Sequence, residues 1–204
     1  MDDEASSVAA TLKSFYDVEM RERATRPLGD ERLHHVEAFA AAARERGCRS
    51  VLEIGCGAGR DGRLLRDAGL SYVGIDLSTQ AARTCRALGL PAVEGSATRL
   101  PFASAGVDAA WSMSTLMHLP GDGFARAIDE LRRVVRPGGL VEIGVWGHTE
   151  DGERTSPDGR YFRQRTDQTL RQELARLGGL LAFETWDWFE DGGHYQWTRV
   201  QVAS

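Results

Sequence analysis

The sequence predicts an α/β fold in which a mostly parallel sheet is covered by helices on both faces. From Ser50 onward, short β-type runs alternate with helical segments, and this alternation favours a parallel sheet. A glycine-rich stretch, Gly55–Gly59, follows the first of these runs, and the acidic residue Asp76 ends the second. In nucleotide-type α/β folds a carboxylate about 20 residues beyond the glycines binds a ribose, so the pattern implies a ligand with an adenosine-like group.

The first 50 residues are predicted to be helical. Their apolar residues recur at helical spacing, as at Val8, Leu12, Phe15 and Tyr16. Residues 27–30 (Pro-Leu-Gly-Asp) break the pattern. Asp30 is expected to cap a second helix, which Gly47 ends.

From Ser50 onward the alternation defines five strands and three helices. The expected strands are Val51–Ile54, Tyr72–Ile75, Ala92–Glu94, Val107–Ser112 and Leu140–Trp146. The helices between them are expected over about Arg60–Asp67, Thr79–Leu88 and Gly123–Val135. The Pro-Gly-Gly run at 137–139 predicts a sharp stop after the last helix, before the following strand.

The C-terminal part of the chain predicts a different arrangement. Residues 148–160 are polar and contain turn-forming residues, which indicates a loop. A helix is expected over Thr166–Leu177, with Thr166 as its N-cap. Two final β runs, Leu180–Phe189 and Tyr195–Val202, are expected to be joined by a hairpin-type connection.

The composition is that of an ordinary globular chain. Of its 204 residues, 42% are hydrophobic and 27% charged, so one domain with a sizeable core is expected. The net charge of −5 argues against a general affinity for nucleic-acid phosphates, and DNA is not expected as a partner. The three cysteines lack the spacing of a disulfide framework or a zinc site, so we expect no metal and a reduced, cytoplasmic setting. The acidic N-terminus does not resemble a signal peptide, and no run reaches the ~20 apolar residues of a membrane span.

Five motifs follow one another between residues 48 and 202. They are Glu53–Gly59, Gly74–Ser78, Gly95–Phe102, Val107–Met113 and Leu131–Gly139. In this order they resemble the class I S-adenosylmethionine-dependent methyltransferases. The resemblance implies a Rossmann-like, seven-stranded, mostly parallel sheet with a reversed C-terminal strand, and S-adenosylmethionine as the cofactor, with S-adenosylhomocysteine as its product. The dinucleotide fingerprint G-x-G-x-x-G fits less well, because counted from Gly55 its third glycine would fall at Arg60.

By this resemblance residues 1–204 form a single methyltransferase domain. Residues 1–47 are expected to be an N-terminal helical lid and residues 48–147 the cofactor-binding core. Residues 148–204 are expected to supply a substrate-side loop, a helix and the closing hairpin. The oligomeric state is open between a monomer and a homodimer.

The resemblance also implies a ligand map. The residues expected at the methionine part of the cofactor are Gly55, Cys56, Gly57, Gly59 and Arg60. Arg60 starts a helix whose N-terminal N–H groups would lie near this part of the cofactor. Asp76 would accept both ribose hydroxyls, and Leu77 would pack on the adenine. Glu53, acidic where a strand residue is usually apolar, would hold water or loop amides beneath the cofactor. Cys56 is expected to be a tolerated small residue and not a nucleophile.

Other cofactor contacts are implied from later strands and from the N-terminal helix. Ser96 and Ala97 would contact the adenine edge, although relatives commonly carry an aspartate at the position of Ser96. Ser112 or Met113 would offer a carbonyl to the cofactor's ammonium group. Tyr16 would close over the methionine end.

The acceptor side is less well marked. His118 follows the methyl-facing strand and is the candidate general base; the equally weighted alternative is a histidine that bonds to backbone at a helix start. Trp146 and His148 lie at the expected ligand-binding rim and are weaker substrate candidates. Tyr161 and Arg165 belong either to a lid that contacts substrate or to a solvated loop.

Three functions remain open on the sequence. The favoured one is methyl transfer to an oxygen or nitrogen of a small metabolite, with alignment and exclusion of water as the protein's main tasks. The second is methylation of a modified tRNA base, for which the arginines between 154 and 176 would bind phosphate. The third is a protein of this fold that binds the cofactor without transferring methyl. The chain lacks the Pro-Pro-aromatic and Pro-Cys signatures of exocyclic-amine and cytosine-carbon methylation, and it lacks an acidic cluster for magnesium.

Overall fold

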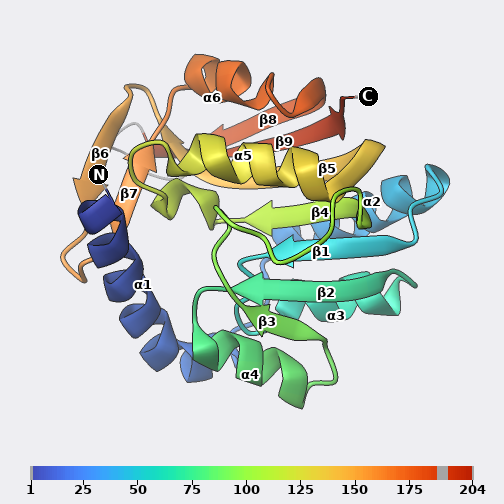
Figure 1. Ribbon diagram of the computed structural model, residues 1–204, viewed down its shortest axis with the longest axis horizontal. Helices are drawn as coiled ribbons and strands as arrows, with labels where there is room; N and C mark the ends of the chain where they lie inside the picture. The colour runs from blue at the N-terminus through green and yellow to red at the C-terminus, as the bar shows by residue number, and fades with distance from the viewer. Residues whose placement is uncertain (1, 188–192, 204) are drawn as a thin grey trace.

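The computed structural model describes residues 2–187 and 193–203. The strands of its main sheet are β1 (Ser50–Ile54), β2 (Ser71–Asp76), β3 (Ala92–Glu94), β4 (Val107–Met113), β5 (Val135–His148), β8 (Gly178–Asp187) and β9 (Gly193–Val202). They lie in the order β3-β2-β1-β4-β5-β9-β8 (Figure 1). The first five pair in parallel, whereas β9 runs antiparallel to both β5 and β8. The predicted seven-stranded, mostly parallel sheet with one reversed C-terminal strand is confirmed.

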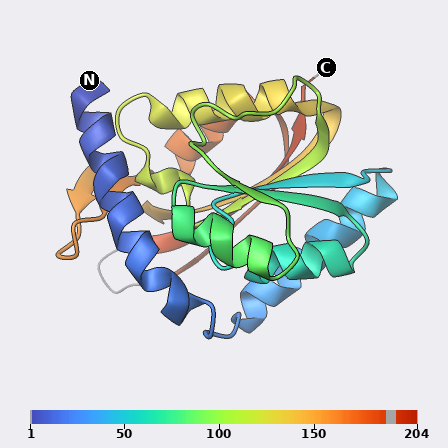
Figure 2. The same ribbon diagram turned by 60° about the horizontal axis from the view of Figure 1, so that its bottom comes forward.

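Helices cover both faces of the sheet and the carboxyl ends of its parallel strands. They are α1 (Asp2–Arg23), α2 (Asp30–Glu45), α3 (Arg60–Asp67), α4 (Thr79–Ala87), α5 (Gly123–Val134) and α6 (Asp167–Leu174), with a 3₁₀ turn, η1 (Leu116–His118). Helices α5 and α6 lie on one face, and α2, α3 and α4 lie on the other (Figure 2). Helix α1 crosses the carboxyl ends of the parallel strands (Figures 1 and 2).

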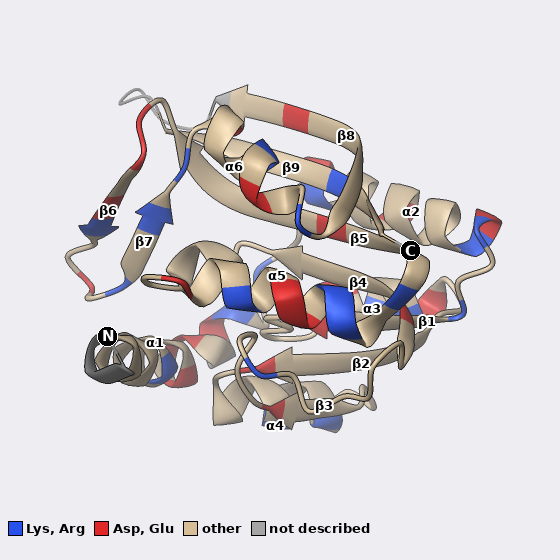
Figure 3. Cartoon of the chain, turned by 45° about the horizontal axis from the view of Figure 1, so that its top comes forward, with Lys and Arg blue, Asp and Glu red and all other residues tan. Residues whose placement is uncertain are grey.

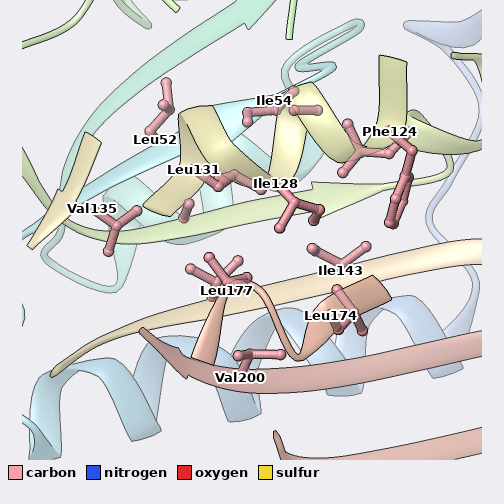
Figure 4. Packing of buried hydrophobic residues seen from close by; sticks show 14 of the residues in the cluster. Leu52, Ile54, Phe124, Ile128, Leu131, Val135, Ile143, Leu174, Leu177 and Val200 are labelled. Atoms are coloured by element: carbon pink, nitrogen blue, oxygen red, sulfur yellow. The ribbon is translucent and has the colours of Figure 1, made fainter. Parts of the chain in front are cut away.

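Two apolar layers fix the helices on the sheet. On one face, Ile128 and Leu131 of α5 pack in the same cluster as Ile143 of β5 (Figure 4). On the other, Phe39 of α2 and Leu65 of α3 are fully buried against the strands. Burying one such side chain contributes about 1.5–3 kcal/mol, so these layers make the strand ends a rigid edge on which to build a site.

The segment predicted as a loop, residues 148–160, contains a strand. In the structure β6 (Gly152–Thr155) pairs antiparallel with β7 (Tyr161–Gln164) as a separate two-stranded sheet. The sequence did not indicate this strand because β6 is mostly exposed and has no apolar alternation. The hairpin lies beside the N-terminal half of α1 (Figure 1), where Gly159 approaches Thr11.

The two predicted helix caps have different outcomes. Gly29, not Asp30, occupies the N-cap of α2, and Asp30 is the first helical residue, where its negative charge favours the positive end of the helix dipole. Thr166 caps α6 as predicted, because its side chain accepts a hydrogen bond from the N–H of Thr169. That helix is shorter than predicted and ends at Leu174.

The strand that follows α5 is longer than predicted. The expected stop at residues 137–139 does not separate helix from strand, because β5 begins at Val135 and the pairing with β4 shifts register there. The last two strands begin earlier than predicted, at Gly178 and Gly193. The predicted hairpin connection lies largely in residues 188–192, outside the described part of the chain.

Candidate functional site

A pocket of about 390 Å³ opens at the carboxyl ends of β1, β2 and β4. Its walls are the β1–α3 loop, the end of β2, the β3–β4 connection and the segment from β4 through η1. Helix α1 supplies a further wall with Val8, Leu12, Tyr16 and Met20, which share one face at four-residue spacing. Ligands of open α/β sheets bind at this edge.

The loop after β1 is shaped by glycines in the left-handed conformation. Gly55 has a φ of +78°, and a Cβ there would lie 1.9 Å from Oγ1 of Thr115, so a side chain would displace the segment after β4. Gly57 has a φ of +50°, and the nearest described atom to a Cβ there would be the Gly55 carbonyl oxygen at 4.0 Å. The wall of the pocket at Gly57 is therefore bare backbone. Gly59 is the N-cap of α3 and faces Leu90, so it lies behind this wall.

Asp76 ends β2 at the wall of the pocket. Its Oδ2 accepts a hydrogen bond from the N–H of Gly57 at 2.8 Å, and its Oδ1 accepts one from the N–H of Ser78 at 2.8 Å. Burial raises the pKa of Asp76, and these two backbone hydrogen bonds oppose the rise. An ionised carboxylate has about four acceptor positions, so Asp76 can accept two further hydrogen bonds from a ligand. Leu77 lines the pocket beside it.

Glu53 and Cys56 lie under the glycine loop, and both line the pocket. Glu53 is buried and accepts a hydrogen bond from the Tyr72 hydroxyl at 2.6 Å, and burial holds its pKa well above the ordinary range. The Sγ atoms of Cys56 and Cys85 are 3.6 Å apart, and this hydrogen bond together with burial raises the pKa of Cys56. A thiol kept protonated in this way is a packing group, in line with its expected role as a small residue.

The β3–β4 connection brings Ser96 and Ala97 to the pocket. The Ser96 hydroxyl is already engaged in its own turn, 2.9 Å from Oγ1 of Thr98 and 3.2 Å from the Thr98 N–H. Past β4, Met113 lines the pocket. Ser112 is buried behind it and donates a hydrogen bond to a backbone carbonyl of β1 at 3.2 Å.

His118 and Tyr16 form a hydrogen-bonded pair in the pocket. Nε2 of His118 lies 3.0 Å from the Tyr16 hydroxyl, and Nδ1 lies 2.7 Å from the carbonyl oxygen of Tyr161. A carbonyl oxygen only accepts, so Nδ1 carries the proton. Burial lowers the pKa of His118 to about 4, so the ring is neutral near pH 7 and the Tyr16 hydroxyl donates to Nε2. One ring nitrogen of His118 therefore bonds to backbone while the ring lines the pocket, and the role of His118 as a general base stays a prediction.

Polar contacts hold α1 over the pocket. Lys13 donates to the Leu77 carbonyl at 3.2 Å and to the Thr79 hydroxyl at 2.5 Å. One turn later, Asp17 accepts a hydrogen bond from the Ser78 hydroxyl at 2.5 Å. The helix is thereby tied to the segment that directly follows β2.

Arginine side chains that sequence reasoning missed also line the pocket. Arg32 of α2 donates from Nε to Oδ2 of the buried Asp61 at 2.7 Å, and the same oxygen accepts from the indole N–H of Trp111 at 2.8 Å. Arg23 of α1 lies with its guanidinium 5.0 Å from the centroid of the Tyr16 ring. Asp61, an acidic residue just after the glycine loop, was the available signal for this network; nothing in the sequence marked Arg32.

The candidates on the substrate side lie outside the described lining of the pocket. They are Trp146, His148, Tyr161 and Arg165. Arg165 is buried, with Nε 2.5 Å from a carboxylate oxygen of Glu173 and its guanidinium 4.0 Å from the centroid of the Phe124 ring. Arg165 therefore holds α6, through Glu173, close to α5, through Phe124.

Of the other three candidates, Trp146 and Tyr161 lie around His118. The Trp146 ring stacks on Phe162 of β7 with centroids 5.4 Å apart, and Phe162 packs edge-on against His118 at 4.6 Å. Tyr161 contributes its backbone carbonyl, as described above, and not its side chain. Nδ1 of His148 accepts a hydrogen bond from the N–H of Glu150 at 3.2 Å. Trp146 and Tyr161 thus support His118, and none of the three lines the described pocket.

Residues 2–187 and 193–203 contain neither a metal-binding cluster nor a membrane-spanning helix. No group of three or more His, Cys, Asp or Glu side chains there is placed to hold a metal ion. None of the helices in this part of the chain is both long and apolar enough to cross a bilayer.

The chain matches known proteins over its central part. Residues 52–143 match the family model of the methyltransferase domain. The chain is 34% identical over 141 residues to 2-methyl-6-phytyl-1,4-hydroquinone methyltransferase of Synechocystis sp., a match that covers 64% of this chain and 43% of that protein. It is 34% identical over 102 residues to tRNA (carboxymethyluridine(34)-5-O)-methyltransferase of Arabidopsis thaliana, covering 50% of this chain and 25% of that protein. The chain thus spans less than half the length of these curated relatives.

The fold as a whole has solved counterparts. One is 1,6-didemethyltoxoflavin-N1-methyltransferase of Burkholderia thailandensis, solved with 1,6-didemethyltoxoflavin and S-adenosylhomocysteine bound, which matches with a TM-score of 0.74 and 20% identity over 98% of this chain and 91% of that chain. At that identity the likeness concerns the fold alone. Sheet order, the glycine loop, the acidic end of β2 and the match of residues 52–143 to the methyltransferase domain agree, and together they support a class I S-adenosylmethionine-dependent methyltransferase.

Proposed function

We propose that this chain binds S-adenosylmethionine beneath α1 and transfers its methyl group to an oxygen or nitrogen of a small molecule, leaving S-adenosylhomocysteine. The observation that carries the proposal is that one pocket contains Asp76, the bare backbone of Gly57 and the His118–Tyr16 pair. The residues present fit the cofactor. Asp76 retains acceptor positions for two ribose hydroxyls, and Ala97 and Leu77 offer apolar surface for an adenine.

The methionine part of the cofactor is charged at both of its termini. Its carboxylate would meet the positive charges of Arg32 and Arg60 and the N-terminal N–H groups of α3. Its ammonium group would meet a backbone carbonyl near Met113 and a carboxyl oxygen of Glu53, which accepts a hydrogen bond in either protonation form. The pocket thus supplies cations for the carboxylate and acceptor oxygens for the ammonium group.

The chain's own residues have a limited chemical task. The bound cofactor supplies a methyl group that its sulfonium charge already activates. The chain must align the acceptor with that methyl and exclude water, and α1 serves the second need by covering the pocket. Neutral His118 has an unprotonated ring nitrogen, so the pocket contains a base for an acceptor that arrives protonated.

The charge distribution supports a small molecule over tRNA as the acceptor. Of the six arginines between 154 and 176, four pair with carboxylates: Arg160 with Asp158, Arg163 with Glu153, Arg165 with Glu173 and Arg176 with Asp129. The other two lie over aromatic rings: Arg154 over Phe162 and Arg171 over Phe183. Basic and acidic residues are interspersed on β6, β7 and α6 (Figure 3). A phosphate-binding surface needs a basic face that is not neutralised in this way.

The test is transfer of label from methyl-labelled S-adenosylmethionine into two probes, a mixed metabolite extract and total tRNA. We expect label in the small-molecule fraction, and none with the Asp76→Ala variant. Label in tRNA alone would replace the small-molecule acceptor with RNA. Cofactor binding without label in either probe would mean that the chain does not transfer methyl.

A further inference from the structure

The Tyr16 hydroxyl covers Nε2 of His118 inside the pocket. Both residues line the pocket, but His118 is 6% exposed whereas Tyr16 is half-buried. The single lone pair of the unprotonated Nε2 already accepts the Tyr16 proton at 3.0 Å. A ligand in the pocket therefore reaches the Tyr16 hydroxyl first, and it can bond Nε2 directly only by displacing Tyr16.

The β6–β7 hairpin fixes the orientation of the histidine. The Tyr161 carbonyl accepts the Nδ1 proton at 2.7 Å, and the Phe162 ring packs edge-on against the imidazole with centroids 4.6 Å apart. The tautomer of His118 is thereby held with Nε2 directed at Tyr16. Because this orientation comes from a separate element, it persists when Tyr16 is changed.

The same hairpin places a cation against Tyr16. The Arg160 guanidinium lies 4.6 Å from the centroid of the Phe15 ring, which packs edge-on against the Tyr16 ring, and it is anchored by Asp158 at 2.7 Å. Burial raises the pKa of Tyr16, and the positive charges of Arg23 and Arg160 oppose that rise. A hydroxyl that donates to a neutral imidazole beside two guanidinium charges is polarised for proton transfer.

The remaining charges around the pair come from α1 and from the β6–β7 hairpin. Glu19 of α1 adds to the rise in the pKa of Tyr16. Around His118, after burial and the bond to Tyr161, the charges of Arg160 and Arg23 disfavour the imidazolium and Asp158 favours it. The imidazolium is therefore a transient state at neutral pH.

Resting on the proposed methyl transfer, we propose that Tyr16 is the catalytic residue that contacts the acceptor and relays its proton to His118, with Arg160 as a positioning residue. An acceptor oxygen attacks the methyl carbon with a lone pair, and the sulfur–methyl bond breaks with its electron pair left on sulfur. The acceptor proton passes to the Tyr16 oxygen while the Tyr16 proton passes to Nε2 of His118. The positive charge thus moves from sulfur to the imidazole, which then releases the proton to water.

The relay selects a class of acceptor. A buried imidazole with a pKa of about 4 takes a proton readily only from a group that gives it up easily. The acceptors that fit are phenolic or enolic hydroxyls and acidic ring N–H groups. Aliphatic alcohols hold their proton too tightly, and unprotonated amines need no relay.

The hydrogen bond at the centre of the relay can be tested without an acceptor. In ¹⁵N-histidine-labelled protein with S-adenosylhomocysteine bound, we expect His118 to be neutral and protonated at Nδ1 at pH 7, its signals identified with His118→Gln. Tyr16→Phe should shift the Nε2 resonance, and Val18→Ala, at an exposed position (82%) of the same helix, should not. A proton on Nε2, or an Nε2 shift unaffected by Tyr16→Phe, would overturn the relay.

Turnover tests the catalytic role. With labelled cofactor and the metabolite extract, Tyr16→Phe should keep its affinity for S-adenosylhomocysteine within about twofold and lose about 10²-fold or more in transfer at pH 7. The deficit should shrink as pH rises and the acceptor ionises in solution, and Arg160→Lys should retain more activity than Arg160→Met. A deficit independent of pH would make Tyr16 merely structural and overturn the relay. Failure of the wild-type chain to bind S-adenosylhomocysteine would instead overturn the proposed function, which distinguishes the two.

Discussion

Replacing Asp76 should weaken cofactor binding far more than it disturbs the fold. Its carboxylate organises the loop through Gly57 and Ser78, and it would accept two ribose hydroxyls. A hydrogen bond to a charged group contributes about 1.5–3 kcal/mol. The loss of two such bonds in Asp76→Ala amounts to about 3–6 kcal/mol, or a drop in affinity of roughly 10²- to 10⁴-fold.

Calorimetric titration with S-adenosylhomocysteine measures this loss. The matched control is Asp108→Ala, because Asp108 also accepts backbone hydrogen bonds, from Arg49 at 2.8 Å and Ser50 at 3.0 Å, but at the amino ends of the strands. We expect the control to lose stability in thermal denaturation and to keep the affinity of the wild-type chain. If Asp76→Ala bound S-adenosylhomocysteine within about fivefold of the wild-type chain, the assignment of Asp76 to the ribose would be wrong, because even one lost bond is expected to cost more.

Three further predictions concern stability. His118 has a pKa near 6.5 in the unfolded chain and about 4 in the folded chain, so the stability that it contributes is present above pH 6.5 and is lost as pH falls through 4. Between these two pH values the free energy of unfolding of the wild-type chain should fall by about 3 kcal/mol more than that of His118→Gln. Equal losses for the two proteins in urea unfolding would contradict this. Gly55→Ala should cost more than about 2 kcal/mol because of its clash, and Gly47→Ala, at φ +70° with no described atom within 4 Å, only about 1 kcal/mol. Similar costs for the two in chemical denaturation would contradict the clash. Asp61→Ala should cost about 3 kcal/mol, because it leaves the Arg32 charge without its buried partner, and a loss below about 1 kcal/mol would show the pair to be unimportant.

The parts of the fold that were predicted correctly have local signals. The strand Val51–Ile54 is a short apolar run followed by glycines, and Asp76 ends the next such run, so sequence order alone locates the glycine loop and the carboxylate of the pocket wall. Residues 152–155 have no such signal, since their strand is exposed and paired only with β7. The cap of α2 was misplaced because Asp30 has the residue type of a cap but already has a helical position.

The parts of the site that the sequence did not indicate depend on tertiary contacts. Arg32 and Asp61 are 29 residues apart, and they meet only because α2 and α3 pack on the same face of the sheet. Tyr16 and His118 are 102 residues apart, and their contact depends on α1 being tied down by residues such as Lys13. Contacts of this kind arise from tertiary packing, and no periodicity or spacing in the sequence indicates them.

The most direct measurement is calorimetric titration of the chain with S-adenosylmethionine, S-adenosylhomocysteine and NADH in parallel. The assignment of the pocket predicts one site per chain for each of the first two and no binding of NADH. It rests on the Gly55-x-Gly57-x-Gly59 loop and on Asp76, which are arranged for a nucleoside joined to an amino acid. Binding of NADH without binding of S-adenosylmethionine or S-adenosylhomocysteine would contradict that assignment.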